Sequence, residues 1–183
     1  MKIEVELKFP IADLSVLRRK LTELGADWFD TRDEADTYYA HPSRDFVETD
    51  EALRIRRVDD HSRMTYKGPK LDAATKSRRE IELPLGDTAQ AAADWASLLE
   101  ALGFRPVATV RKHREKALVP WQGREVEASL DQVASVGTFV ELELMAEDDE
   151  FDSARATVST LAEHLGLCES ERRSYLELLL KSS

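Results

Sequence analysis

The chain has 183 residues, 34% of them charged, and a formal net charge of −10. This length is typical of one domain, and we expect a single domain over residues 1–183. The negative charge disfavours nucleic acid and anionic membranes as partners, although a locally cationic pocket could still bind a small anion. The single cysteine, Cys168, excludes a disulfide framework, a zinc knuckle and a redox pair within one chain. No apolar run approaches the roughly 20 residues that span a bilayer and no signal-peptide pattern is present, so we expect a cytoplasmic protein.

Residue periodicity predicts a strand and then a helix at the start of the chain. Apolar and charged residues alternate strictly up to Phe9, which predicts a strand over residues 2–9. Apolar residues at spacings of three and four, from Ile11 to Leu24, predict a helix that ends at Gly25. Short apolar runs between turn residues then predict five more strands, over residues 27–32, 36–41, 52–58, 63–67 and 77–83.

The second half of the chain returns to helices and then to strands. A helix is predicted over residues 88–102, with Trp95, Leu98, Leu99 and Leu102 on one face. Strands are predicted over residues 107–119, 125–131 and 138–145, and helices over 151–165 and 169–180. About eight strands and three or four helices result. Because strands and helices do not alternate one to one, an α+β fold is favoured over a doubly wound parallel sheet.

Several predicted strands carry a charged residue at every second position. The wet face of an open antiparallel sheet would explain one such strand. Glutamate is a poor strand former, however, and paired glutamates at alternate positions recur on three strands. Eight strands can close around one small ligand. The pattern therefore favours a closed eight-stranded antiparallel β-barrel, a tunnel with its charged faces inward and helices packed outside.

The charged positions of these strands make up a candidate lumen of nearly balanced charge. Its cations are Lys8, Arg54, Arg56, Lys67, Arg78, Lys112 and Arg114. Its anions are Glu4, Glu6, Glu80, Glu82, Glu141 and Glu143, with Asp131 nearby. Buried charges must be paired or bound to something. Carboxylate oxygens suit Mg²⁺ or Mn²⁺, and the remaining basic groups could then bind a polyanion. A bulge in its strand would place Arg79 in the lumen instead of Arg78.

Eight ordered motifs along the chain carry a resemblance to a known family. They are KIEVELK (2–8), which contains ExExK, DTYYAHP (36–42), TDEALRIRR (49–57), TYKGPK (65–70), RREIEL (78–83), VRKHRE (110–115), SLDQVASVGTFVELEL (129–144) and SYLELL (174–179). Together they resemble the CYTH superfamily, the triphosphate tunnel metalloenzymes. The motifs of residues 36–57 and 65–70 look most like its class IV adenylyl cyclase branch.

The resemblance implies a closed antiparallel barrel of about eight strands, a divalent metal ion, and a substrate with a triphosphate tail such as ATP, tripolyphosphate or thiamine triphosphate. Carried over by motif, the metal ligands are Glu4, Glu6, Glu141 and Glu143. The phosphate-binding residues are Lys8, Arg54, Arg56, Lys67, Lys112 and Arg114, with Arg78 as a further candidate. Catalysis falls to Glu4, Glu6, Lys8 and Asp131, and Glu80 and Glu82 are further candidates for the site. The cyclase branch also implies a homodimer.

Three functions stay open from the sequence. The first, which we favour, is adenylate cyclase, which converts ATP to cyclic AMP and pyrophosphate. The second is a triphosphatase that hydrolyses tripolyphosphate, thiamine triphosphate or nucleotides. The third is a non-catalytic module that binds polyphosphate or a nucleotide. Tyr175 and Arg172, in the predicted C-terminal helix, either close one mouth of the tunnel or pack outside it.

Overall fold

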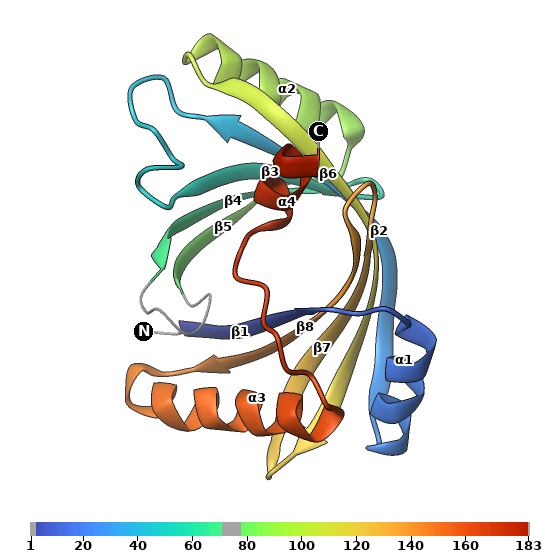
Figure 1. The fold of residues 1–183 in the computed structure, drawn as a ribbon. Coiled ribbons are helices and arrows are strands. Elements are labelled where there is room, and N and C mark those ends of the chain that lie inside the picture. The colour runs from blue at the N-terminus through green and yellow to red at the C-terminus, as the bar shows by residue number, and fades with distance from the viewer. Residues whose placement is uncertain (1–2, 71–77, 183) are drawn as a thin grey trace.

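A computed structural model describes residues 3–70 and 78–182, so Lys2 and Ser77, at the start of two predicted strands, lie outside the described residues. Its strands form one antiparallel sheet in the order β1-β8-β7-β6-β2-β3-β4-β5 (Figure 1). The strands are β1 (Ile3–Pro10), β2 (Asp27–Ala40), β3 (Ala52–Val58), β4 (His61–Lys70), β5 (Arg78–Gly86), β6 (Arg105–Trp121), β7 (Arg124–Val133) and β8 (Gly137–Ala146). The helices are α1 (Leu14–Glu23), α2 (Ala89–Ala101), α3 (Phe151–Leu165) and α4 (Tyr175–Ser182), with a short 3₁₀ turn at Asp148–Glu150. The α+β class is confirmed.

The sheet curls into a half-barrel with β1 and β5 at its two edges (Figure 1). A closed barrel requires these edges to pair, and no backbone pairing joins them within residues 3–70 and 78–182. The predicted closure is therefore not confirmed. Two side chains of like charge, Glu4 on β1 and Glu80 on β5, meet at the gap, and the charge of Glu80 contributes to the raised pKa of Glu4. Two carboxylates can share this contact only with a proton or a cation between them.

The apolar face of the sheet points outward and is covered by helices, as an inverted barrel requires. On β1 and β8, Val5 and Leu142 are fully buried in the main hydrophobic core. They pack in a cluster with Leu21 of α1 and with Val158 and Leu161 of α3. Because alternate strand residues point to opposite faces, burying these positions turns the charged positions of the same strands toward the concave side.

Helix α2 covers the other half of the sheet, but not with the face that we predicted. Leu99 is buried against Tyr39, Leu53 and Ile55, with Ala92 and Ala96 packed beside it. Three of the residues predicted to pack, Trp95, Leu98 and Leu102, are instead exposed. The face of α2 toward the sheet is therefore formed by Leu99 and small alanine side chains, whereas the three other large apolar side chains face solvent.

Strand β2 is one long strand where two short strands were predicted. It runs from Asp27 to Ala40 and pairs with β6 along most of its length, with register shifts between Trp28 and Asp30 and between Tyr38 and Tyr39. Residues 32–34 are all charged, and this run interrupts the apolar alternation that sequence periodicity detects. Residues 33–35, which were predicted to lie between strands, therefore have a fixed strand register.

Helix α4 lies on the concave side of the sheet and covers one end of the half-barrel (Figure 1). The predicted helix at 169–180 begins only at Tyr175, after a capping box in which Ser174 and Glu177 exchange hydrogen bonds of 3.1 and 2.6 Å. Apolar residues at one end of the concave face pack against it, namely Tyr38, Val110, Val133 and Phe139. In the described part of the chain, no helix is long and apolar enough to cross a membrane.

Candidate active site in the half-barrel

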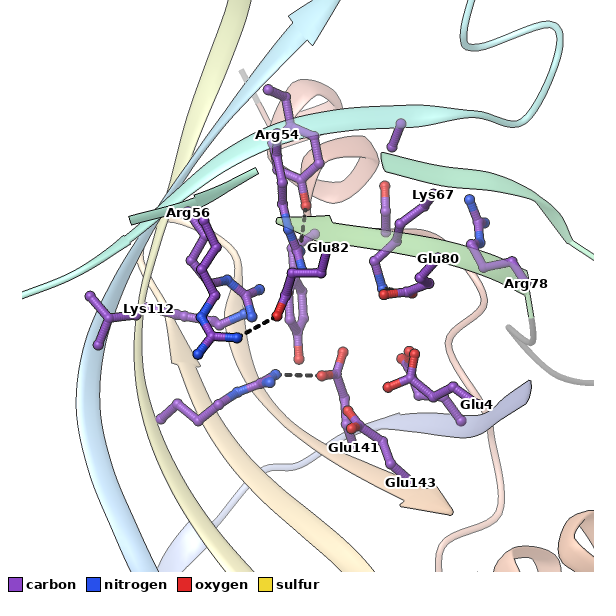
Figure 2. A pocket seen from close by; sticks show the side chains of 18 of the residues that line it. Glu4, Arg54, Arg56, Lys67, Arg78, Glu80, Glu82, Lys112, Glu141 and Glu143 are labelled. Atoms are coloured by element: carbon purple, nitrogen blue, oxygen red, sulfur yellow. Dashed lines mark hydrogen bonds and ion pairs between the residues drawn. The ribbon is translucent and has the colours of Figure 1, made fainter. Parts of the chain in front are cut away.

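The concave face of the sheet encloses a cavity of about 500 Å³. Figure 2 shows its two sides, with Arg56 and Lys112 on one and Glu4, Glu141 and Glu143 on the other. Most of the predicted lumen residues line it: Glu4, Glu6, Arg54, Arg56, Lys67, Arg78, Glu80, Glu82, Lys112, Arg114, Glu141 and Glu143. Of the predicted site, only Lys8 and Asp131 are not among the lining residues. The alternation of charge thus brings most of the predicted set into one cavity.

One side of the cavity holds a group of buried carboxylates from β1 and β8. Glu6 lies directly opposite Glu143 in the strand pair. Burial is the main cause that raises the pKa of Glu143 well above its usual range, and the neighbouring carboxylates of Glu4, Glu141 and Glu6 add to it. Burial likewise raises the pKa of Glu4 to about 7, against the attraction of Lys67. Neighbouring cations therefore do not fully balance the negative charge on this side of the cavity.

The chemistry of this carboxylate group fits a divalent metal ion. Its donors are oxygens, which Mg²⁺ and Mn²⁺ prefer, and a cation would offset both the burial and the repulsion that raise the two pKa values. Among the described residues, no three His, Cys, Asp or Glu side chains already form a closed ligand set. Magnesium commonly keeps several waters and shares substrate phosphates, so a preformed protein cage is not required.

The opposite side of the cavity holds three cations that are paired with two buried carboxylates. Asp36 on β2 accepts two hydrogen bonds from Arg56, of 2.7 and 2.8 Å, and one of 3.2 Å from Arg54. Glu34 lies 3.0 Å from the ammonium group of Lys112 and 3.2 Å from Nε of Arg56. Burial opposes ionisation of both carboxylates, yet the surrounding cations hold the pKa of Glu34 at about 2 and that of Asp36 well below its usual range.

A chain of polar contacts joins the carboxylate side to the C-terminal helix. Arg114 donates two hydrogen bonds to Asp131, of 2.7 and 2.5 Å, and also pairs with Glu141. Asp131 accepts a further hydrogen bond of 2.7 Å from the hydroxyl of Tyr175. Asp131 is fully buried and lies directly opposite Arg114 in the β6–β7 pair, so it orients Arg114 without lining the cavity itself. Tyr175 lines the cavity and is buried, which places it inside the half-barrel and not on its outer surface.

Lys8, the lysine of ExExK, lies against the C-terminal segment. Its ammonium group donates a 2.5 Å hydrogen bond to the carbonyl oxygen of Arg173 and sits 4.0 Å from the centre of the Tyr175 ring. The backbone N–H of Glu171 also donates to the carbonyl oxygen of Lys8 at 2.7 Å. For Lys8 to bind a phosphate, as the motif implies, its ammonium group would have to exchange these contacts.

The edge strand β5 contributes Arg78, Glu80 and Glu82 to the cavity. Arg78 lines it and Arg79 is exposed, so the alternative position for this cation is excluded. Arg78 also reaches the side chain of Asp50, at 3.3 Å. Glu80 pairs with Lys67.

The predicted lumen set leaves out Arg32 and Tyr175, which line the cavity, and also Glu34 and Asp36, which contact its cations from β2. Glu34 and Asp36 alternate with Arg32 along β2, which is the same signal that identified the other strands. Breaking β2 into two strands hid that alternation. Tyr175 was considered at a tunnel mouth, but its place in the cavity depends on how α4 folds back, and periodicity does not report this.

The fold and the cavity define a class of protein: an inverted antiparallel half-barrel whose concave face concentrates acidic and basic groups. The chain belongs to the CYTH family, since a model of the CYTH domain matches residues 2–175. This family is metal dependent and acts on triphosphate substrates.

Relatives that are similar along nearly the whole chain agree with this membership. A protein of Methanocaldococcus jannaschii, named "Putative adenylate cyclase MJ0240", is 37% identical over 179 residues, which are 96% of this chain and 98% of that protein. The structure of PH1819 from Pyrococcus horikoshii OT3 has a TM-score of 0.86 and 40% identity, covering 98% of this chain and 99% of that one. The Hippeastrum protein HpAC1, titled a putative adenylyl cyclase with a dominant triphosphatase activity, shares the fold with a TM-score of 0.67 and 19% identity, over 99% and 96% of the two chains.

Proposed function

We propose that this protein is a metal-dependent enzyme that acts on a triphosphate bound in the half-barrel, and that its reaction converts ATP to cyclic AMP and pyrophosphate. The observation that carries the proposal is the division of one cavity into a carboxylate side and a cationic side. A triphosphate needs both, because its own negative charge must be bound by cations and shared with a metal ion.

Each side has a separate task in this proposal. Glu4, Glu6, Glu141 and Glu143 would hold Mg²⁺ or Mn²⁺, which when bound supplies charge neutralisation and lowers the pKa of an attacking hydroxyl or water. Arg54, Arg56, Lys112 and Arg114 would bind the phosphate oxygens and hold the chain in one orientation, with Lys67 and Arg78 at the β4–β5 edge. The guanidinium of Arg54 lines the cavity, and its Nε is buried without a hydrogen-bond partner in the described residues.

Positioning accounts for most of the catalysis that such a site can supply. Phosphoryl and nucleotidyl transfer need little covalent chemistry from the protein and depend on alignment and charge stabilisation. In the cyclase reaction, the cationic side would hold the triphosphate so that the ribose 3′-hydroxyl lies in line with the α-phosphate. Pyrophosphate is then the leaving group, and Arg56 and Lys112 would stabilise its developing charge.

The choice of cyclisation rests on the relative from Methanocaldococcus jannaschii, which is similar over almost the full length of both chains and is named as a putative adenylate cyclase. Hydrolysis of the terminal phosphate is the second candidate, and one observation favours it. The lining is mostly charged, and its aromatic side chains are Tyr38, His61 and Tyr175 among the described residues. A site that binds a phosphate chain without a base is consistent with such a lining.

A product screen tests the proposal. The purified chain is incubated with ATP, tripolyphosphate or thiamine triphosphate, each with Mg²⁺ and with Mn²⁺, and the products are separated by chromatography. Cyclic AMP with pyrophosphate supports the cyclase. ADP with orthophosphate, or cleavage of tripolyphosphate without any cyclic product, replaces it with the triphosphatase. Binding of these ligands without turnover would identify a non-catalytic module. The homodimer stays a prediction, which light scattering would test.

A further inference from the structure

Two buried carboxylates contact cations of the cavity without lining it themselves, and they have no place in the proposed chemistry. Glu34 and Asp36 are each 2% exposed and alternate on the concave face of β2. They lie on the cationic side, so they compete with a phosphate for the same guanidinium and ammonium groups. A site that only needed positive charge would be better without them, and their presence requires an explanation.

The geometry around Asp36 shows what these carboxylates do to the cations. Arg56 lies directly opposite Asp36 in the β2–β3 pair, and its Nε and Nη2 donate to the two oxygens of Asp36 in a bidentate arrangement. Such an arrangement fixes the plane of the guanidinium as well as its position. Arg54, two residues before Arg56 on β3, donates to the same carboxylate from Nη1. One carboxylate therefore sets the orientation of two arginines.

Glu34 does the same for the ammonium side of the cluster. Its Oε2 lies between Lys112 and Arg56, at 3.0 and 3.2 Å, and its Oε1 accepts a 2.7 Å hydrogen bond from Arg32. Lys112 is paired with Glu34 and lies 3.7 Å from Asp36, and it is almost completely buried. Burial, together with Arg114 and Arg56, lowers the pKa of Lys112, and the negative charge of Asp36 opposes this shift.

We propose that Glu34 and Asp36 are positioning residues, which hold Arg54, Arg56 and Lys112 in the orientation that binds the phosphate chain. This inference rests on the proposed function, since it assigns a role within the same cavity. The carboxylates act through the cations and do not themselves contact the substrate. The carboxylates compete with phosphate for the cations, which weakens binding. They also orient the cations before the substrate binds, which strengthens it.

The test is the binding of tripolyphosphate to variants of β2, measured by titration calorimetry with and without Mg²⁺. Asp36→Asn removes the charge but keeps the size of the side chain. We expect it to weaken tripolyphosphate binding by about tenfold or more, which is the effect of losing one charged hydrogen bond. The matched control is Asp33→Asn, since Asp33 is on the same strand, faces outward and is exposed. Its binding should equal that of the wild type.

A double-mutant cycle separates positioning from a merely structural role. If Asp36 acts through the arginines, adding Asp36→Asn to Arg56→Ala should weaken binding by clearly less than Asp36→Asn does alone. Glu34→Gln, combined with Lys112→Ala, gives a second and independent cycle should the Asp36 variant fail to fold. Asp36→Glu, which keeps the charge, should recover part of the lost affinity.

The outcomes distinguish this inference from the proposed function. A wild-type protein that does not bind tripolyphosphate would overturn both. A wild-type protein that binds it, with Asp36→Asn and Glu34→Gln binding equally well or more tightly, would overturn the positioning role alone, because the carboxylates would then only compete. Fully additive losses in both cycles would also overturn it.

Discussion

The two sides of the cavity carry opposite charge and differ in how far that charge is compensated. On the cationic side, Arg54, Arg56 and Lys112 all have carboxylate partners from β2 within 3.2 Å. On the carboxylate side, burial and neighbouring carboxylates raise the pKa values of Glu4 and Glu143. The cationic side is thus already arranged without a ligand, whereas the carboxylate side needs a proton or a cation to be stable. The predictions that follow test this difference.

The largest effect is expected on the carboxylate side, where activity and stability should respond in opposite directions. Glu143→Gln should lower turnover roughly 100-fold or more, because even the partners of metal ligands can contribute up to 100-fold. The same variant should melt at an unchanged or higher temperature without metal, since burial and three carboxylates oppose the charge that it removes. Turnover and thermal melts of the metal-free protein check this. Glu125→Gln, an exposed position on neighbouring β7, is the control and should change neither quantity.

On the cationic side, Arg56→Ala should weaken triphosphate binding by about tenfold or more, because a charged hydrogen bond contributes roughly 1.5–3 kcal/mol. The loss should be much smaller for a monophosphate competitor, which does not reach across the cation cluster. Competition titrations with both ligands measure it. Arg57→Ala is the matched control, since Arg57 is the next residue on β3 and is exposed. Equal losses for the two ligands would contradict the assigned role.

The raised pKa of Glu4 also predicts that stability depends on pH. The pKa of Glu4 is raised from 4.5 to about 7, so between these pH values the folded chain binds more protons than the unfolded chain. The free energy of unfolding should therefore fall as pH rises through this window. Thermal melts from pH 4.5 to 8 measure the fall, which Glu4→Gln should reduce. Saturating Mg²⁺ should also reduce it, because a cation binds the deprotonated carboxylates. A fall of the same size in wild type and variant would exclude Glu4 as its source.

The comparison also shows which parts of the site could be predicted from the sequence. The pairs Arg54 and Arg56, and Glu141 and Glu143, were placed in one lumen because alternation along a strand is a local signal. Their joint position follows once the apolar face is buried outside. The predicted roles of these residues stay predictions until they are measured.

Features that depend on contacts between distant segments were not predictable in this way. Glu34 was missed because the charged run at residues 32–34 was interpreted as a break between strands, and Asp36 because it then stood alone at the start of the next predicted strand. The exposed face of α2 reflects how closely its alanines let it approach the sheet. Whether β1 and β5 pair depends on the side chains that meet across the two edges, such as Glu4 and Glu80, and no periodicity within either strand reports that.

The smallest effect is expected where the two sides meet the C-terminal helix. Tyr175 donates to Asp131, which in turn orients Arg114, and its ring faces Lys8 at 4.0 Å. Tyr175→Phe removes the hydroxyl and keeps the ring, so Asp131 retains its two hydrogen bonds from Arg114. We expect a destabilisation of roughly 1 kcal/mol, the usual net contribution of one hydrogen bond, and little change in triphosphate affinity. Tyr175→Ala also removes the ring that covers Lys8 and packs on Phe139, and should destabilise by clearly more. Chemical denaturation of the two variants measures both values. If Tyr175→Phe costs as much as Tyr175→Ala, the hydroxyl and not the ring attaches α4 to the cavity.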